Sequence, residues 1–221
     1  KVLLISSNEV GKRMTQHRNV VDAARAAGVK LLAYTSILHA DRNPMSLAAE
    51  HRATEEYIRA AGMPFVLLRN GWYTENYTMN IASVMQHNIL LGSARDGRIS
   101  SAARADLAVA AAIVLADAVQ KHAGNVYELA GDDAFTLAQY AAEIARQSGR
   151  PIVYRDLPEA DYKAVLQQAG VPEIFAAVFA ESDAHAAVDV LYEDNRELSR
   201  LIGRPTTPFA TSIAKALATL K

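Results

Sequence analysis

The chain has 221 residues, 51% of them hydrophobic, and its 23 basic and 24 acidic residues give a formal net charge of −1. That length suits one α/β domain, or one domain with a small second lobe, and the near-zero charge argues against nucleic acid and membranes as partners. The absence of cysteine excludes disulfides and thiolate sites, and without a signal segment or a membrane-length apolar run the sequence predicts a cytoplasmic protein.

Helix and strand alternate through the first part of the chain. The opening residues, 2–6, are apolar on both faces, which is typical of a strand buried in a parallel sheet. Two Ala-rich amphipathic stretches follow, and each ends in AAG and runs into another apolar segment. Gly28 and Gly62 suit the left-handed position after a helix end. This order predicts a parallel sheet of βαβ units, with strands in VLLIS, LLAYTS and FVLLRNG.

The same pattern continues with looser spacing after residue 100. Residues 105–119 are expected to form a helix, and residues 125–131 a short strand that ends in glycine. Thr136 and Gln139 have the spacing of a capping box, so a further helix is predicted to begin there.

The last third of the chain is expected to be mainly helical. A strand-like segment, residues 151–157, precedes it, and Pro172 and the GRPTTP turn interrupt it before a final helix over residues 212–221. We therefore expect a boundary near residues 150–157, with the second lobe packed on the first.

The first predicted strand would leave a bare, apolar sheet edge. Soluble proteins avoid such edges. We therefore expect either that preceding βα units are missing from this chain or that a partner covers the edge.

Five phrases together resemble a known family, the NmrA-like branch of the atypical short-chain dehydrogenase/reductases, and within it the bacterial NAD(P)H-dependent quinone oxidoreductases. The likeness reaches LSRLIGRPTTP near the end of the chain. The phrases are LLISSNEVG, KLLAYTSILHAD, EHRATEEYIRAAG, FVLLRNGWYTENY and SAARADLAVAAA.

The resemblance implies an α/β fold with a Rossmann-like parallel sheet and flanking helices. Residues 1–150 would form a partial NAD(P)-binding domain, and residues 151–221 a smaller substrate-side lobe. The family's glycine-rich phosphate loop does not occur here. The resemblance therefore implies that three βα units, roughly 65–70 residues, are missing before residue 1.

The function implied by the resemblance is hydride transfer from NADPH to a small-molecule quinone, with a homodimer as a compatible assembly. Without the phosphate loop, we expect this chain to bind NADPH poorly and its activity to be impaired. An alternative is a non-catalytic NAD(P)-sensing regulator that acts through a protein partner. A third reading is an inert truncation product.

Candidate cofactor-binding residues follow the strands, because ligands of doubly wound sheets bind outside the carboxyl ends of the strands. For Ser6 and Ser7 the alternative role is helix capping, and for residues 70–76 it is an aromatic plug under a loop. The resemblance places Arg104 near the cleft, and the alternative for this residue is a pair with Asp106. The candidates are Ser6, Ser7, Asn8, Tyr34, Thr35, Asn70, Gly71, Trp72, Tyr73, Thr74, Glu75 and Arg104.

The catalytic candidates are His51 and Ser36. Typical short-chain dehydrogenases use Tyr-x-x-x-Lys, and both residues are absent from the corresponding helix. His51 and Glu55 share a helix face, which allows either a proton relay or a surface ion pair. Ser36 falls near the usual serine position, where capping is the alternative. A quinone can accept hydride without a strong relay.

No metal site is expected. The remaining histidines share no metal-ligand spacing and are predicted to be surface or capping residues. They are His17, His39, His87, His122 and His185.

Overall fold

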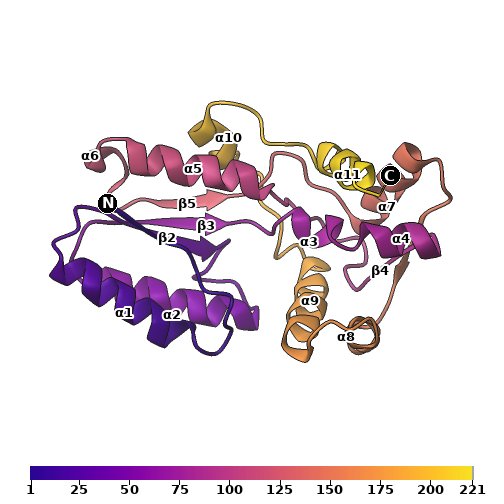
Figure 1. Cartoon of the computed structure of the whole chain (residues 1–221), viewed down its shortest axis with the longest axis horizontal. Helices are drawn as coiled ribbons and strands as arrows, with labels where there is room; N and C mark the ends of the chain where they lie inside the picture. The colour runs from indigo at the N-terminus through magenta and orange to yellow at the C-terminus, as the bar shows by residue number, and fades with distance from the viewer. Residues whose placement is uncertain (221) are drawn as a thin grey trace.

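The main sheet of the protein has four parallel strands in the order β1-β2-β3-β5 (Figure 1). The structure is a computed structural model that describes residues 1–220. All four strands match predicted segments, with β2 running one residue beyond its segment, which confirms the predicted parallel α/β sheet. The strands are β1 (Val2–Leu4), β2 (Leu32–Ile37), β3 (Phe65–Asn70) and β5 (Val126–Leu129).

The first strand is shorter than predicted. It pairs on one side only, with β2, and ends at Leu4. The next residue, Ile5, is 68% exposed. The chain leaves the sheet there because the backbone N–H of Ser6 donates to Thr35 Oγ1 at 2.8 Å, in place of a ladder bond.

Helices cover both faces of this sheet (Figure 1). Alternate residues of one strand face opposite helices, as the two-residue period of a strand requires: Leu67 packs in the cluster of one face, and Val66 and Leu68 in that of the other. The left-handed helix ends at Gly28 and Gly62 are confirmed, with φ of 62° and 69°. The helices are α1 (Arg13–Ala26) and α2 (Ser46–Ala60) on one face, and α5 (Arg104–Ala116) and α10 (Glu197–Ile202) on the other; the short α6 (Val119–His122) follows α5.

A second lobe is built around a small sheet of two parallel strands, β4 and β6. The predicted boundary near residue 150 falls between these strands, so the lobe takes residues from both sides of it. The capping box of Thr136 and Gln139 is confirmed. The final helix, predicted over residues 212–221, begins earlier in the structure, at Phe209. Residue 221 of the predicted range lies outside the described residues. The elements are α3 (Glu75–Thr78), α4 (Ile81–His87), β4 (Ile89–Gly92), α7 (Leu137–Ser148), β6 (Val153–Asp156), α8 (Glu159–Gln168), α9 (Glu173–Ala186) and α11 (Phe209–Ala218).

Three histidines lie in the interior, where the sequence predicted surface or capping positions. His17, His39 and His122 are each less than a tenth exposed. The side chains of His39 and His122 bond to Glu193 and Tyr127, at 2.9 Å in each case. These partners compensate the burial of the imidazoles. Among residues 1–220, no helix combines the length and the apolar character needed to cross a membrane.

Candidate functional site

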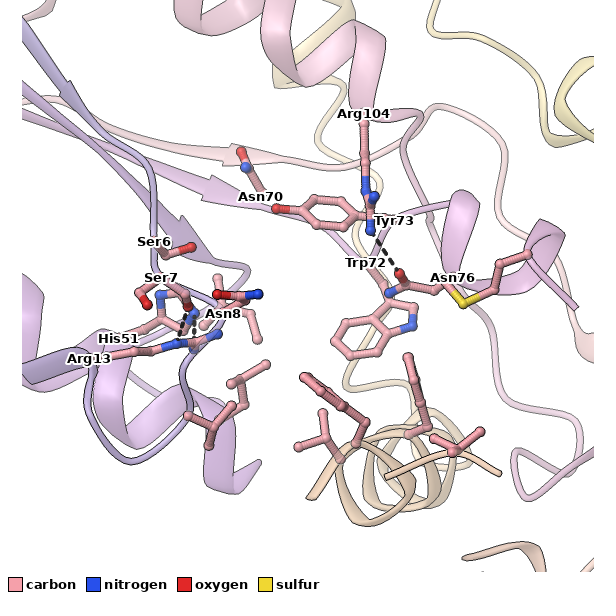
Figure 2. A pocket seen from close by; sticks show the side chains of 18 of the residues that line it. Ser6, Ser7, Asn8, Arg13, His51, Asn70, Trp72, Tyr73, Asn76 and Arg104 are labelled. Atoms are coloured by element: carbon pink, nitrogen blue, oxygen red, sulfur yellow. Dashed lines mark hydrogen bonds between the residues drawn. The ribbon is translucent and has the colours of Figure 1, made fainter. Parts of the chain in front are cut away.

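A cleft of about 670 Å³ opens at the carboxyl ends of β1, β2 and β3 (Figure 2). The connection between α8 and α9 closes its other side. This is the position expected for a ligand of a doubly wound sheet, and the volume suits a small molecule. Ten of the predicted site residues line the cleft: Ser6, Ser7, Asn8, Ser36, His51, Asn70, Gly71, Trp72, Tyr73 and Arg104.

The turn after β1 forms the first wall. The backbone N–H of Ser7 donates to His17 Nε2 at 3.1 Å, and its hydroxyl accepts from the backbone N–H of Glu9. The next helix begins only at Arg13, with no side-chain cap. The serines therefore do not cap that helix, and their turn is held by hydrogen bonds from the neighbouring elements.

His51 is held between Arg13 and Tyr34. Its Nε2 lies 3.2 Å from Arg13 Nη1, and its Nδ1 lies 2.8 Å from the Tyr34 hydroxyl. Because an arginine only donates, Nε2 must accept, and Nδ1 carries the proton. Burial, and then the charge of Arg13, lower the pKa of His51 to about 3. His51 is thus neutral at physiological pH, which argues against the predicted proton relay.

Ser36 is tied to a buried ionic cluster. Its hydroxyl donates to Glu55 Oε1 at 2.6 Å, and Arg69 donates to both oxygens of Glu55 at 3.0 and 2.8 Å. Since the Ser36 proton points to Glu55, the hydroxyl can only accept hydrogen bonds from a ligand. The predicted surface pair of His51 and Glu55 is wrong: both residues are buried, and their hydrogen bonds go to different partners.

Residues after β3 form the middle of the cleft. Trp72 is 9% exposed, and its ring meets the ring of Phe179 edge-on, with 6.4 Å between centroids. A side chain at Gly71 would meet the carbonyl oxygen of Leu129 at 3.1 Å and that of Ser100 at 3.3 Å. Glycine at this position therefore lets the segment pack closely against the end of β5.

Arg104 stacks on the ring of Tyr73, with its guanidinium carbon 4.7 Å from the ring centroid (Figure 2). Its Nη2 also donates to Asn76 Oδ1 at 3.4 Å. The predicted alternative, a pair with Asp106, is wrong, because the buried Asp106 pairs with Arg204 at 2.5 Å. The Arg104 guanidinium consequently remains at the cleft.

Four predicted residues lie outside the cleft lining and support it from behind. Tyr34 is fully buried and holds His51, and Thr35 accepts from Ser6. The Thr74 hydroxyl bonds to that of Ser101, and Glu75 accepts from the backbone N–H of Arg104 at the start of α5.

The sequence reasoning missed part of the lining. Arg13 gave no signal, because a single arginine at a helix start is usually exposed. The amide of Asn76 belongs to a segment already singled out and could have been found there. The apolar residues of α9 and of the connection before it carry only the pattern of a buried helix face. Those residues include Val171, Phe175, Val178 and Phe179.

The chain matches the NmrA-like family over residues 1–207. It is 51% identical to quinone oxidoreductase 2 of Escherichia coli over 97% of this chain and 74% of that protein. Its fold matches a crystal structure of an E. coli NADPH-dependent quinone oxidoreductase in complex with NADPH, with a TM-score of 0.94, 51% identity, and coverage of 97% of this chain and 75% of that one. Triphenylmethane reductase of Citrobacter sp. in complex with NADP(H) matches with a TM-score of 0.90 and 32% identity, over 97% of this chain and 75% of that one.

Proposed function

Because the chain belongs to the NmrA-like family, we propose that it is an NADPH-dependent quinone oxidoreductase. One observation carries this proposal: a chain 51% identical to such an enzyme forms a cleft with a polar wall and an aromatic wall at the carboxyl ends of its strands. The alternative, a non-catalytic regulator, is less supported, since the likeness to the enzyme extends over 97% of the chain. Cytoplasmic location and a homodimer stay predictions.

The polar wall fits the nicotinamide end of NADPH. Hydroxyl and amide groups of Ser6, Ser7, Asn8 and Asn70 line the cleft and can bond ribose hydroxyls and a carboxamide. The Arg104 guanidinium lies at the same cleft and favours a negatively charged ligand. When bound, NADPH supplies the hydride, while the protein orients the two reactants.

The aromatic wall fits a flat, apolar substrate. Trp72, Phe175, Phe179 and Val171 present apolar surface to the cleft opposite the polar wall. Stacking and burial against these side chains would hold a quinone ring. The quinone also needs one proton. His51 is too weakly basic to carry it, and the hydroxyl of Ser36 already donates its own proton to Glu55.

Replacing Trp72 by leucine is expected to raise KM for benzoquinone about two- to tenfold, because stacked aromatic rings contribute about 0.5–1.5 kcal/mol beyond burial. KM for NADPH should stay within about twofold of the wild-type value, because the aromatic wall is proposed to hold the quinone and the polar wall the cofactor. The measurement is quinone-dependent oxidation of NADPH by the purified natural protein. Phe65→Leu is the control, since Phe65 lies at the opposite end of β3 from the cleft.

Two results would count against this proposal. A wild-type protein that binds NADPH but shows no quinone-dependent oxidation would favour the regulator. Equal effects of the two substitutions on KM for benzoquinone would remove the quinone from the aromatic wall.

A further inference from the structure

A second, smaller cavity lies behind the cleft, in the second lobe. We call it the inner cavity; its volume is about 80 Å³. Five residues line both spaces, so that the two spaces adjoin: Trp72, Asn76, Met79, Val171 and Phe179. The polar residues that line the inner cavity are Asn76, Tyr77, Asn80, Tyr162 and Asp183.

Asp183 is the acidic group of the inner cavity. It lies one turn beyond Phe179 on α9, on the same helix face, and is 4% exposed. Its Oδ2 accepts the backbone N–H of Ser93 at 3.1 Å. A side chain at Gly92 would come within 2.8 Å of the same oxygen, so β4 leaves room for this carboxyl group.

The surroundings of Asp183 favour its protonated form. Burial raises the pKa of Asp183 to about 7, and the charge of Asp156 on β6 also raises it, while the N–H of Ser93 lowers it. Tyr154 on β6, Tyr162 on α8 and Tyr77 on α3 face the same carboxyl, and burial raises the pKa of each hydroxyl above its usual value. On α9 itself, Glu181 and His185 lie 4.0 Å apart and pair with one another. The carboxyl group therefore gains and loses its proton near neutral pH.

Polar atoms without partners also line the inner cavity. The Tyr77 hydroxyl is buried and has no hydrogen-bond partner within residues 1–220, and the same is true of Asn80 Oδ1. Buried groups of this kind usually bind ordered water. Since one water occupies about 30 Å³, the inner cavity has room for at least two.

We propose that Asp183 supplies the proton consumed in quinone reduction, through water held in the inner cavity. This inference rests on the proposed function. Hydride transfer adds two electrons and one hydrogen to the quinone and leaves a hydroquinone monoanion. The carboxyl proton of Asp183 passes through the water to the phenolate oxygen and completes the hydroquinone. Solvent then reprotonates the Asp183 carboxylate.

Intrinsic fluorescence tests the titration without any cofactor, because Trp72 is the single tryptophan of the chain and lines the inner cavity. The wild-type protein is expected to show a change in emission centred near pH 7. Asp183→Asn should remove this change. Asp161→Asn should keep it, because Asp161 is an exposed carboxylate on α8. A change that persists in Asp183→Asn overturns the inference.

The pH dependence of kcat with benzoquinone tests the proton transfer. The wild-type kcat is expected to fall above pH 7, where Asp183 loses its proton. Asp183→Asn should lower kcat at pH 6 about tenfold, less than direct general acid catalysis gives because bulk water competes, and should flatten the profile. KM for NADPH should not change. Asp161→Asn should match the wild type.

The outcomes separate the two proposals. If the wild type is active and Asp183→Asn shows the same pH profile, this inference alone is overturned. A wild type without quinone-dependent NADPH oxidation overturns the proposed function and this inference with it. If Asp183→Asn lowers Tm, Tyr77→Phe decides, because it removes only an unpartnered hydroxyl: a lower kcat at unchanged Tm supports the inference, and an unchanged kcat overturns it.

Discussion

Replacing Arg69 by methionine is expected to lower the free energy of unfolding by about 3–5 kcal/mol, the usual cost of removing one partner of a buried ion pair. The Arg69 side chain is 7% exposed and that of Glu55 5%. Arg69 also binds Glu128 at 2.8 Å and Asp41 at 2.9 Å. Without the guanidinium, Glu55 remains as a buried carboxylate with no cation, which explains the large cost.

Urea unfolding of the wild type and the variant measures this loss. Arg146→Met is the control, because Arg146 forms a pair with Glu143 but its side chain is 70% exposed. Exposed pairs contribute about 0–1 kcal/mol, so the control should lose far less. The double variant Arg69→Met with Glu55→Gln should be less destabilised than the sum of the two single variants. A loss for Arg69→Met as small as that of the control would contradict the expectation.

Acid is expected to destabilise the protein through His51, by about 3 kcal/mol between pH 6.5 and pH 4. The pKa of His51 is about 3 in the folded protein and 6.5 when unperturbed. Between these values the unfolded state binds a proton that the folded state does not. The stabilising contribution is therefore complete above pH 6.5 and is lost as the pH falls.

Asp183 acts in the opposite sense over an overlapping range. Its pKa is raised from 3.8 to about 7 on folding, so the folded state binds the extra proton between these values. Its contribution to stability is therefore lost as the pH rises. The net pH profile of the wild type mixes the two effects, and a variant is needed to isolate either one.

Comparison with His51→Gln isolates the histidine, because glutamine does not titrate and its amide oxygen can still accept from Arg13. The difference in unfolding free energy between the wild type and this variant is expected to shift by about 3 kcal/mol in favour of the variant from pH 6.5 to pH 4. His87→Gln, at an exposed position, should follow the wild type. A constant difference across this range would show that His51 is not held neutral.

The ionic cluster also supports the cleft. Arg69 fixes Glu55, which in turn accepts the proton of Ser36 in the cleft lining. On the other side, Arg13 fixes both His51 and the carbonyl of Ser7. Neither catalytic candidate of the sequence analysis is free to donate a proton. The proton consumed in quinone reduction therefore has to come from another group, and the proposed donor is Asp183 in the second lobe.

Local pattern determined much of the fold. The strands, the helix ends at Gly28 and Gly62, and the capping box at Thr136 depend on side-chain period and backbone preference within a few residues. The local sequence is therefore sufficient to predict these features. The same holds for the site residues that directly follow strands, because the carboxyl ends of parallel strands always meet at one edge of the sheet.

Tertiary structure alone decided the partners of those residues. His51 and Glu55 share a helix face, as their spacing requires. Because the helix packs against β2 and β3, however, His51 forms a hydrogen bond with Tyr34, and Glu55 forms hydrogen bonds with Ser36 and Arg69. Apart from Trp72, the aromatic wall comes from α9 and the turn before it, as does Asp183, about a hundred residues further along the chain. Burial sets the charge of an ionisable group, and burial depends on residues distant in sequence. For this reason the sequence alone located the cleft, whereas the protonation of the groups around it required the folded structure.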